Sequence, residues 1–208
     1  MTKLAIIYYS STGTVDTMAR RLAATAEAAG DVEVRLRHVA EIAPQEAIDS
    51  QAAWKQHRAA VADDPVATPD DLDWADVALF GSPTRYGHVT SQLQAFIDTL
   101  GPLWAQGKLA DKVYAGFTAS QTLHGGQEST LLNLYTSFFH FGGIVVAPGY
   151  TDPVKFGDGN PYGAAKVTGA STELDEQDLA ALDHLVNRAL AISRRLEAGG
   201  NGASRDDA

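Results

Sequence analysis

Residues 3–30 read KLAIIYYSSTGTVDTMARRLAATAEAAG, and this stretch decides the fold. It opens with a continuous apolar run, which is typical of a parallel strand covered on both faces. The polar turn at residues 10–14 interrupts the run. Apolar side chains then recur four residues apart at Met18, Leu22 and Ala26, which predicts a helix directly after the turn.

The next segments complete a supersecondary unit. We expect the first strand over residues 3–9 and the helix over residues 15–29, with Gly30 as its C-cap. Residues 32–39 alternate apolar and polar side chains, which indicates a more exposed strand at an edge. A strand, a helix and a second strand in this order predict a right-handed β-α-β unit.

The rest of the chain repeats this alternation. Further strands are expected over residues 77–82, 112–119 and 143–146, and further helices over residues 91–99, 127–139 and 173–197. Such a sequence of elements predicts an α/β fold: a doubly wound, five-stranded parallel sheet in the order 2-1-3-4-5, with insertions. Its ligand crevice is expected where the loops after the first, third and fourth strands meet.

Two insertions and a tail interrupt the pattern. Residues 40–71 are polar and contain three prolines, and we expect one short helix there, over residues 46–62. Residues 148–170 lack a helical period and are expected to be an ordered insertion. We expect a single domain over residues 1–198 and a disordered tail over residues 199–208.

Composition narrows the possible functions. The formal net charge is −10, from 26 acidic and 16 basic residues, which argues against nucleic-acid binding. There are no cysteines, so a redox role would need a bound cofactor to carry the electrons. The histidines show no metal-ligand spacing, and no metal site is expected. No signal peptide or membrane insertion is apparent, and a cytoplasmic location is expected.

The first loop has the properties of a phosphate site. It lies between a buried strand and a helix start, where backbone N–H groups are unpaired and the helix dipole favours an anion. Because the P-loop lysine is absent, we expect a tightly bound mononucleotide held without a cationic side chain. The plainer alternative is a hydroxyl N-cap with no ligand. The candidate residues are Ser10, Ser11, Thr12, Gly13, Thr14 and Val15.

The second and third loops could hold a planar ring. Tyr86 offers a flat face, Thr84 and Arg85 offer donors, and the glycines let the backbone come close to a ligand. An ordinary surface loop and a bare glycine-rich turn are the alternatives. The candidates in the second loop are Pro83, Thr84, Arg85, Tyr86 and Gly87, and those in the third are Ser120, Gln121, Thr122, Leu123, His124 and Gly125.

Two further residues stand out. His140 follows a helix rich in aromatic side chains, where a histidine is either hydrogen-bonded for structure or functional. Trp104 is expected in a loop, either as a cap over the core or as an exposed stacking surface.

Four segments, read together, carry a family resemblance. They are YYSSTGTVDTMAR, FGSPTRYGHVTSQLQAFIDTLGPLW, GGQESTL and NPYGA. With them the sequence resembles the WrbA family of NAD(P)H:quinone oxidoreductases, within the flavodoxin-like superfamily. The resemblance implies FMN as cofactor, with its phosphate in the first loop, its isoalloxazine along the second, and its pyrimidine side and ribityl chain at the third.

The resemblance also implies a site shared between subunits of a homotetramer. His140 would lie near the flavin as the catalytic candidate that binds or protonates a quinone oxygen, and Trp104 would wall the substrate site. Thr12 occupies a position that is aromatic in some relatives, where it borders the nicotinamide. Leu123 and His124 replace residues that are more often Thr or Gly.

The implied reaction is the two-electron reduction of a quinone by NADH or NADPH at one FMN site. The main alternative is an electron carrier of the flavodoxin type, with one-electron chemistry and no substrate of its own. Reduction of nitro or azo compounds, and a flavin-free interaction module, are further alternatives.

Overall fold

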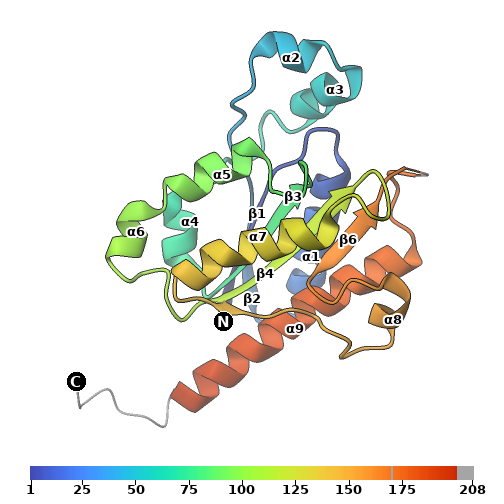
Figure 1. Cartoon of the computed structure of the whole chain (residues 1–208). Coiled ribbons are helices and arrows are strands. Elements are labelled where there is room, and N and C mark those ends of the chain that lie inside the picture. The colour runs from blue at the N-terminus through green and yellow to red at the C-terminus, as the bar shows by residue number, and fades with distance from the viewer. Residues whose placement is uncertain (170, 201–208) are drawn as a thin grey trace.

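The computed structural model describes residues 1–169 and 171–200, which form a parallel sheet with helices on both faces (Figure 1). The strand order is β2-β1-β3-β4-β5, so the predicted order 2-1-3-4-5 is confirmed. The strands are β1 (Thr2–Tyr8), β2 (Val32–His38), β3 (Val77–Pro83), β4 (Val113–Ser120), β5 (Ile144–Val145) and β6 (Ala164–Val167).

The sheet holds one strand that was not expected. β5 pairs with the start of β4, through Val113 and Ile144, and β6 pairs with its end, from Phe117 opposite Ala164. Because β3 occupies the other side of β4, these two short strands share the fifth position. The sequence does not predict β6, because its four residues, AAKV, do not form an apolar run. Only the pairing partner reveals it as a strand.

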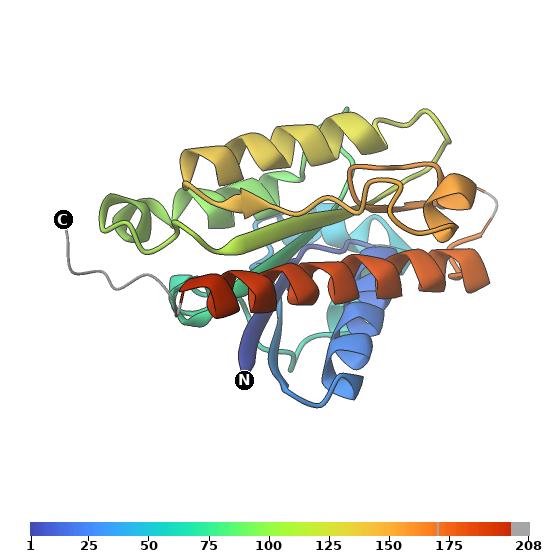
Figure 2. The ribbon, with the colours of Figure 1, turned by 90° about the horizontal axis from the view of Figure 1, so that it is seen from below.

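Helices cover both faces of the sheet, and a separate group of helices packs on each face. Alternate residues of β1 point to opposite faces, so that Leu4 and Ile6 belong to one core cluster and Ala5 and Ile7 to the other. Figure 2 shows α1 and α9 on one side of the sheet and α5 and α7 on the other. The helices that pack on the sheet are α1 (Thr14–Ala28), α4 (Pro69–Trp74), α5 (Ser91–Asp98), α7 (Gln127–His140) and α9 (Glu176–Gly200).

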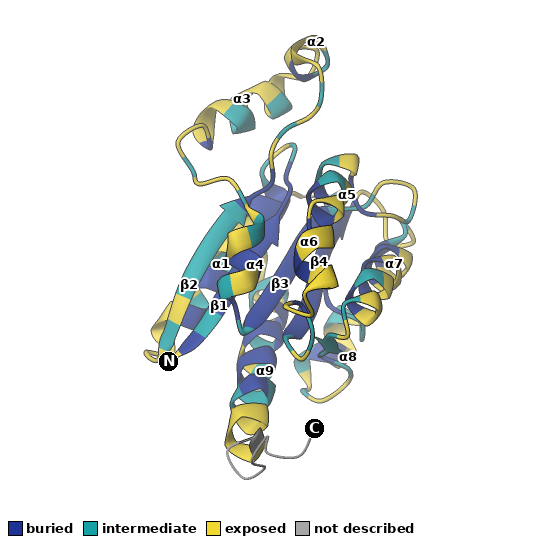
Figure 3. Ribbon diagram, turned by 90° about the vertical axis from the view of Figure 1, so that its left-hand side faces the viewer, coloured by how far each residue is buried: buried dark blue, intermediate teal, exposed yellow. Residues whose placement is uncertain are grey.

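The first insertion differs from its prediction. In place of one helix over residues 46–62 it holds α2 (Gln45–Asp49) and α3 (Ala52–Ala60). The break falls at Gln51, whose extended backbone (φ −125°) starts a new helix. Figure 3 shows both helices set apart from the sheet and largely exposed. The insertion also ends before residue 71, because Thr68 and Asp71 form a capping box that starts α4.

Three more predictions need correction. Trp104 lies in a short helix, α6 (Gly101–Ala105), where Pro102 suits the first turn, and not in a loop. The second insertion contains a short helix, α8 (Val154–Asp158), besides β6. α9 continues through Gly200, so residues 199 and 200 are helical. The remainder of the expected disordered tail, residues 201–208, lies outside the described residues.

No helix within the described ranges combines the length and the apolar character needed to cross a bilayer.

Candidate cofactor site at the carboxyl edge of the sheet

A cavity of about 680 Å³ lies at the carboxyl ends of β1, β3 and β4. This volume falls within the usual range for a small-molecule site. Most of the candidate residues from the three loops line it: Ser10, Ser11, Thr12, Thr14, Val15, Pro83, Thr84, Arg85, Ser120, Gln121, Thr122 and Gly125. Segments far apart in the sequence therefore meet where the sheet topology predicted a crevice.

The first loop presents unpaired backbone donors. Gly13 has a φ of +105°, a conformation that glycine adopts without strain, and it forms the N-cap of α1. Among the described residues, no acceptor bonds to the N–H groups of residues 14–16. The Gly13 N–H itself donates to Ser10 Oγ at 3.1 Å, which fixes the turn. Free N–H groups at a helix start are suited to an anion such as phosphate.

Asp16, in the first turn of α1, forms hydrogen bonds away from the cavity. Asp16 accepts hydrogen bonds from the Tyr8 hydroxyl and from Arg20 Nε. Burial, followed by the bond to Asp16, raises the pKa of Tyr8 far above its ordinary value, so this phenol stays protonated as a donor. Asp16 does not line the cavity, and its charge is neutralised locally.

Arg85 is the one charged residue among the described residues that line the cavity. Its Nη1 donates to the Thr84 carbonyl at 2.9 Å, and its Nη2 donates to Ser11 Oγ at 3.3 Å. The guanidinium of the second loop therefore reaches the first. The expectation that a phosphate there is held without a cationic side chain stays a prediction, and Arg85 is the described cation that lies near enough to bear on it.

The second loop is bonded to the start of α7, the helix that follows the third loop. Thr84 Oγ1 accepts from Thr130 Oγ1 at 2.8 Å and from the Gly87 N–H at 3.2 Å. Gly87 and Gly126 both have positive φ, and a Cβ on Gly126 would lie 3.0 Å from Gly87 Cα. A side chain at Gly126 would press on the backbone of the second loop, and a side chain at Gly87 would meet Ser129 Oγ of α7, 2.7 Å from its Cβ. These contacts hold the second loop, the third loop and the start of α7 in a fixed arrangement.

The third loop leaves backbone donors open. Ser120 Oγ donates to the Thr122 carbonyl at 2.7 Å and accepts from Gln127 Nε2 at 2.8 Å, which ties the loop to α7. A Cβ on Gly125 would lie 2.8 Å from Ser120 Cβ, so the tight turn needs glycine. Within the described part of the chain, the N–H groups of residues 122–124 have no acceptor. Such donors suit carbonyl oxygens or a developing negative charge on a ligand.

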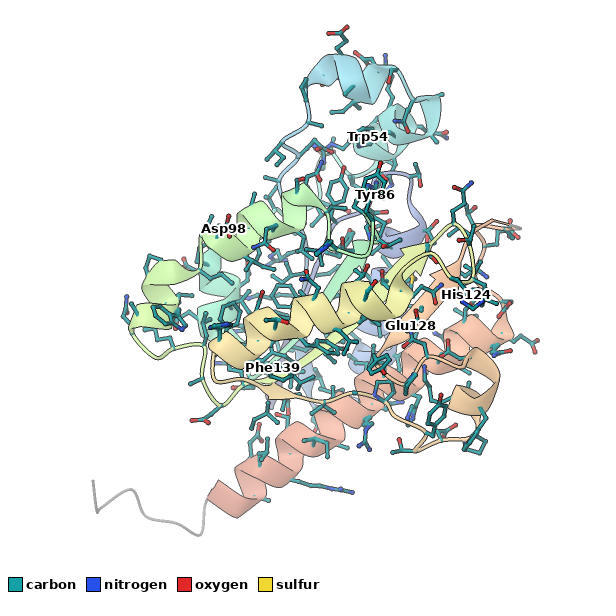
Figure 4. The ribbon with its side chains drawn as sticks, viewed as in Figure 1. Trp54, Tyr86, Asp98, His124, Glu128 and Phe139 are labelled. Carbon is teal, nitrogen blue, oxygen red and sulfur yellow. The ribbon has the colours of Figure 1, made fainter. Side chains whose placement is uncertain are left out.

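Some candidates do not line this cavity: Gly13, Tyr86, Gly87, Leu123 and His124. Tyr86 is fully exposed and has a φ of 54°, a strained conformation for an aromatic residue. Figure 4 shows it on the side of the molecule that bears Trp54. An exposed, strained aromatic residue beside a cavity is available to stack on a planar ligand.

The sequence did not point to every lining residue. Gln51 comes from the break between α2 and α3, and the others come from the end of β4 and from the segment after β6. That segment carries hydroxyls and a glycine, a signal that could have been noticed, but it lies more than forty residues beyond the third loop. The residues missed are Gln51, Ala119, Thr168, Gly169 and Thr172.

Trp104 and His140 lie together, but not at this cavity. Trp104 Nε1 donates to the His140 carbonyl at 2.8 Å, which joins α6 to the end of α7. α7 starts at Gln127 beside the third loop and runs 14 residues back along the sheet, a rise of roughly 20 Å. Figure 4 shows Phe139 and Glu128 near opposite ends of this helix. Within one chain, both residues are therefore remote from the cavity.

The donor set fits FMN. A phosphate matches the free N–H groups of residues 14–16 and the nearby guanidinium of Arg85. The hydroxyls of the lining suit a polyhydroxyl chain, and the open N–H groups of residues 122–124 suit a ring with carbonyl oxygens. No carboxylate that would repel an anion is found among the described lining residues. Nor do the described residues form a group of three or more His, Asp or Glu that could hold a metal ion.

Comparisons with known proteins agree with this geometry. The NAD(P)H dehydrogenase (quinone) of Deinococcus radiodurans is 51% identical over 195 residues, which cover 93% of this chain and 96% of that protein. A protein of the same name from Sinorhizobium fredii is 42% identical over 174 residues, covering 81% and 84%. The crystal structure of the flavodoxin, WrbA-like protein from Agrobacterium tumefaciens superposes with a TM-score of 0.67 at 24% identity, over 94% of this chain and 99% of that one.

The last likeness supports the fold alone, and the flavodoxin-like fold expected from the sequence is confirmed. The model of the family described as NADPH-dependent FMN reductase matches residues 2–152, which include the three loops of the cavity. The chain therefore belongs to the NADPH-dependent FMN reductase family, and its curated relatives are NAD(P)H dehydrogenases of the quinone type.

Proposed function

We propose that this protein is an FMN-dependent NAD(P)H:quinone oxidoreductase, an enzyme rather than an electron carrier. The observation that carries the proposal is the cavity itself, where free N–H groups at a helix start meet one guanidinium and no described carboxylate. The names of the relatives that align over most of the chain supply the nucleotide and the quinone.

We assign a different part of FMN to each of the three loops. The first loop and Arg85 would hold the phosphate of FMN, and the second loop, with Tyr86, would lie along its ring system. The open N–H groups of residues 122–124 would donate to the ring and stabilise negative charge that develops there. When bound, FMN supplies the redox chemistry, because it accepts two electrons from NADH or NADPH and passes them to a quinone.

Trp104 and His140 can serve this site only from another copy of the chain. Both are exposed, and the geometry within one chain keeps them away from the cavity. We propose a homotetramer in which these residues complete a neighbouring site: Trp104 as a wall for the substrate and His140 at a quinone oxygen. A cytoplasmic location belongs to the same proposal, since NADH and NADPH are its substrates.

Purified protein tests the proposal. We expect FMN to bind with a perturbed visible spectrum, and NADH or NADPH oxidation to require both FMN and benzoquinone. Failure to bind FMN would overturn the proposal. Binding without quinone-dependent turnover would leave the carrier alternative. A His140→Ala variant with unchanged quinone turnover would remove that residue from the reaction, and size measurement by light scattering tests the tetramer.

A further inference from the structure

Glu41 lies shortly after β2, and donors from three separate parts of the fold converge on its carboxylate. Oε2 accepts from the Tyr9 hydroxyl at 2.8 Å and from Trp54 Nε1 at 3.1 Å. Oε1 accepts from Gln92 Nε2 at 2.7 Å and from the backbone N–H groups of residues 42 and 43. Because an ionised carboxylate has about four lone-pair sites, these donors saturate it.

The donors connect the first insertion to the body of the protein. Tyr9 directly follows β1, Gln92 lies in α5, and Trp54 lies in α3. α3 has no buried residue, and α2 and α3 pack mainly on each other. The buried apolar residues of the insertion, Ile48 in α2 and Val61 directly after α3, belong to neither core cluster of the sheet. Burial of apolar surface against the sheet therefore contributes little to holding α3 in place. Trp54, packed at the edge of the core and bonded to Glu41, is its main attachment.

The insertion is tied down at its base by other contacts. The Ala67 N–H donates to the His38 carbonyl at 2.8 Å, and Asp64 forms an ion pair with Arg20. These bonds hold the end of the insertion beside β2, but they do not touch α2 or α3. Loss of the Glu41 contacts would consequently free the two helices and leave the base attached.

The placement of α3 matters because it brings two side chains to the first loop, residues 10–15, which we call the phosphate loop. Gln51, at its start, lines the cavity. The ring of His57 faces the loop, since a Cβ on Gly13 would lie 3.6 Å from His57 Nδ1. Burial lowers the pKa of His57 below its ordinary value, which favours a neutral ring with one N–H to donate.

We propose that Glu41 is a positioning residue that fixes α2 and α3 over the phosphate loop, so that Gln51 and His57 complete the phosphate end of the FMN site. The inference rests on the proposed function and adds to it a second source of phosphate contacts, outside the three loops. It also gives the insertion a role in affinity for the cofactor.

Two variants test the positioning step. Glu41→Gln keeps the volume but turns an amide toward the donors, and Trp54→Phe keeps an aromatic ring but removes one donor. Glu46→Gln is the matched control, because it makes the same chemical change at an exposed position of α2. Hydrogen exchange on the FMN-free protein should speed up at least threefold over residues 45–60 in both test variants. Exchange in β1, β3 and β4, and in the control, should not change.

The second measurement is the Kd for FMN, read from the quenching of flavin fluorescence. We expect Glu41→Gln to raise it about tenfold, as loss of contacts worth one to two hydrogen bonds would. Gln51→Ala and His57→Ala should each raise it about threefold without faster exchange in α3. Should Glu41→Gln fail to fold, Trp54→Phe carries both measurements, because it leaves the carboxylate in place.

The outcomes separate the possibilities. Unchanged exchange over residues 45–60 in both test variants would show that Glu41 does not position the insertion. Faster exchange with a Kd within twofold of the wild type would show that the insertion is no part of the site. Wild-type protein that binds no FMN would overturn the proposed function itself, a result distinct from a loss confined to the variants.

Discussion

Arg85 shows how a single charge can matter in an acidic protein. The chain carries a net charge of −10, yet the described lining of the cavity bears no acid and only this one cation. Two hydrogen bonds hold the guanidinium between the first and second loops. A local cation of this kind offsets the repulsion that the whole molecule exerts on an anionic ligand.

We therefore expect Arg85→Met to raise the Kd for FMN about tenfold, because a charge-assisted hydrogen bond at an exposed site is lost. A fluorescence titration measures the change. Arg195→Met, an equal change on an exposed part of α9, is the control and should leave the Kd unaltered. Equal Kd values for both variants would show that Arg85 makes no contact with the cofactor.

A second prediction at this scale concerns pH. Burial raises the pKa of Glu41, but the bonds from Gln92, residue 43, Tyr9 and Trp54 outweigh it and leave the pKa below its ordinary value. A lowered carboxyl pKa contributes stability above the unfolded pKa, and this is lost as the pH falls through the folded pKa. Glu41→Gln should thus be less stable than the wild type at pH 7 by about 1–3 kcal/mol.

Urea denaturation between pH 7 and pH 3.5 measures this difference. The free energies of unfolding of the wild type and of Glu41→Gln should converge below pH 4.5. Protonation of Glu41 removes the carboxylate charge from the wild type there, whereas the substitution removes it at every pH. A gap that stays constant across this range would contradict the linkage.

At the scale of elements, β6 places the segment that follows it along one side of the cavity. It pairs with the end of β4, and the segment after it contributes Thr168 and Thr172 to the lining. Gly163, which directly precedes β6, is closely packed against β4 and α7. A Cβ on Gly163 would lie 2.2 Å from the Gly116 carbonyl oxygen and 3.0 Å from Leu131 Cδ1. A backbone atom cannot give way as a flexible side chain can.

Gly163→Ala should accordingly destabilise the protein by roughly 2–4 kcal/mol, because the methyl group forces β6 away from β4. Chemical denaturation measures the loss. Gly101→Ala is the matched control, since a Cβ there meets nothing within 4 Å, and its effect should stay within about 0.5 kcal/mol. Similar stabilities of the two variants would show that the sheet tolerates the methyl group.

At the scale of the whole molecule, α7 separates the two ends of the proposed active site. Its first residues touch the third loop, and its last residue contacts Trp104 at the other end. No movement of side chains spans such a distance. If both ends take part in one reaction, they must come from different copies of the chain.

Mixed assemblies test this directly. Arg85→Met, assayed at limiting FMN, carries a defect at the cavity, and Trp104→Ala carries one at the remote end. In an assembly that contains both variants, one site combines the intact cavity of the Trp104→Ala chain with the intact Trp104 of the Arg85→Met chain. We expect quinone turnover above the mean of the two parents, measured on hybrids isolated with two affinity tags. Turnover equal to that mean would show that the sites are not shared.

Much of the cavity lining could be predicted because it consists of local features of the sequence. Ser10 and Thr14 stand at a strand-to-helix turn, and a parallel sheet brings all such turns to one edge. Gln51 and Thr168 could not be predicted, because their approach to the cavity depends on how the insertions fold back. The same holds for Arg85 as a partner of Ser11, a contact between loops more than seventy residues apart.

The sequence by itself determined the strand order, the turn between β1 and α1 that leaves N–H groups open, and the exclusion of thiol chemistry. Those properties depend on periodicity, on turn residues and on composition, which act over a few neighbouring residues. Only the tertiary structure decided that the fifth position of the sheet is split, that α2 and α3 are two helices, and that Trp104 and His140 lie away from the cavity. These features depend on pairing and packing between distant segments, which no local pattern records.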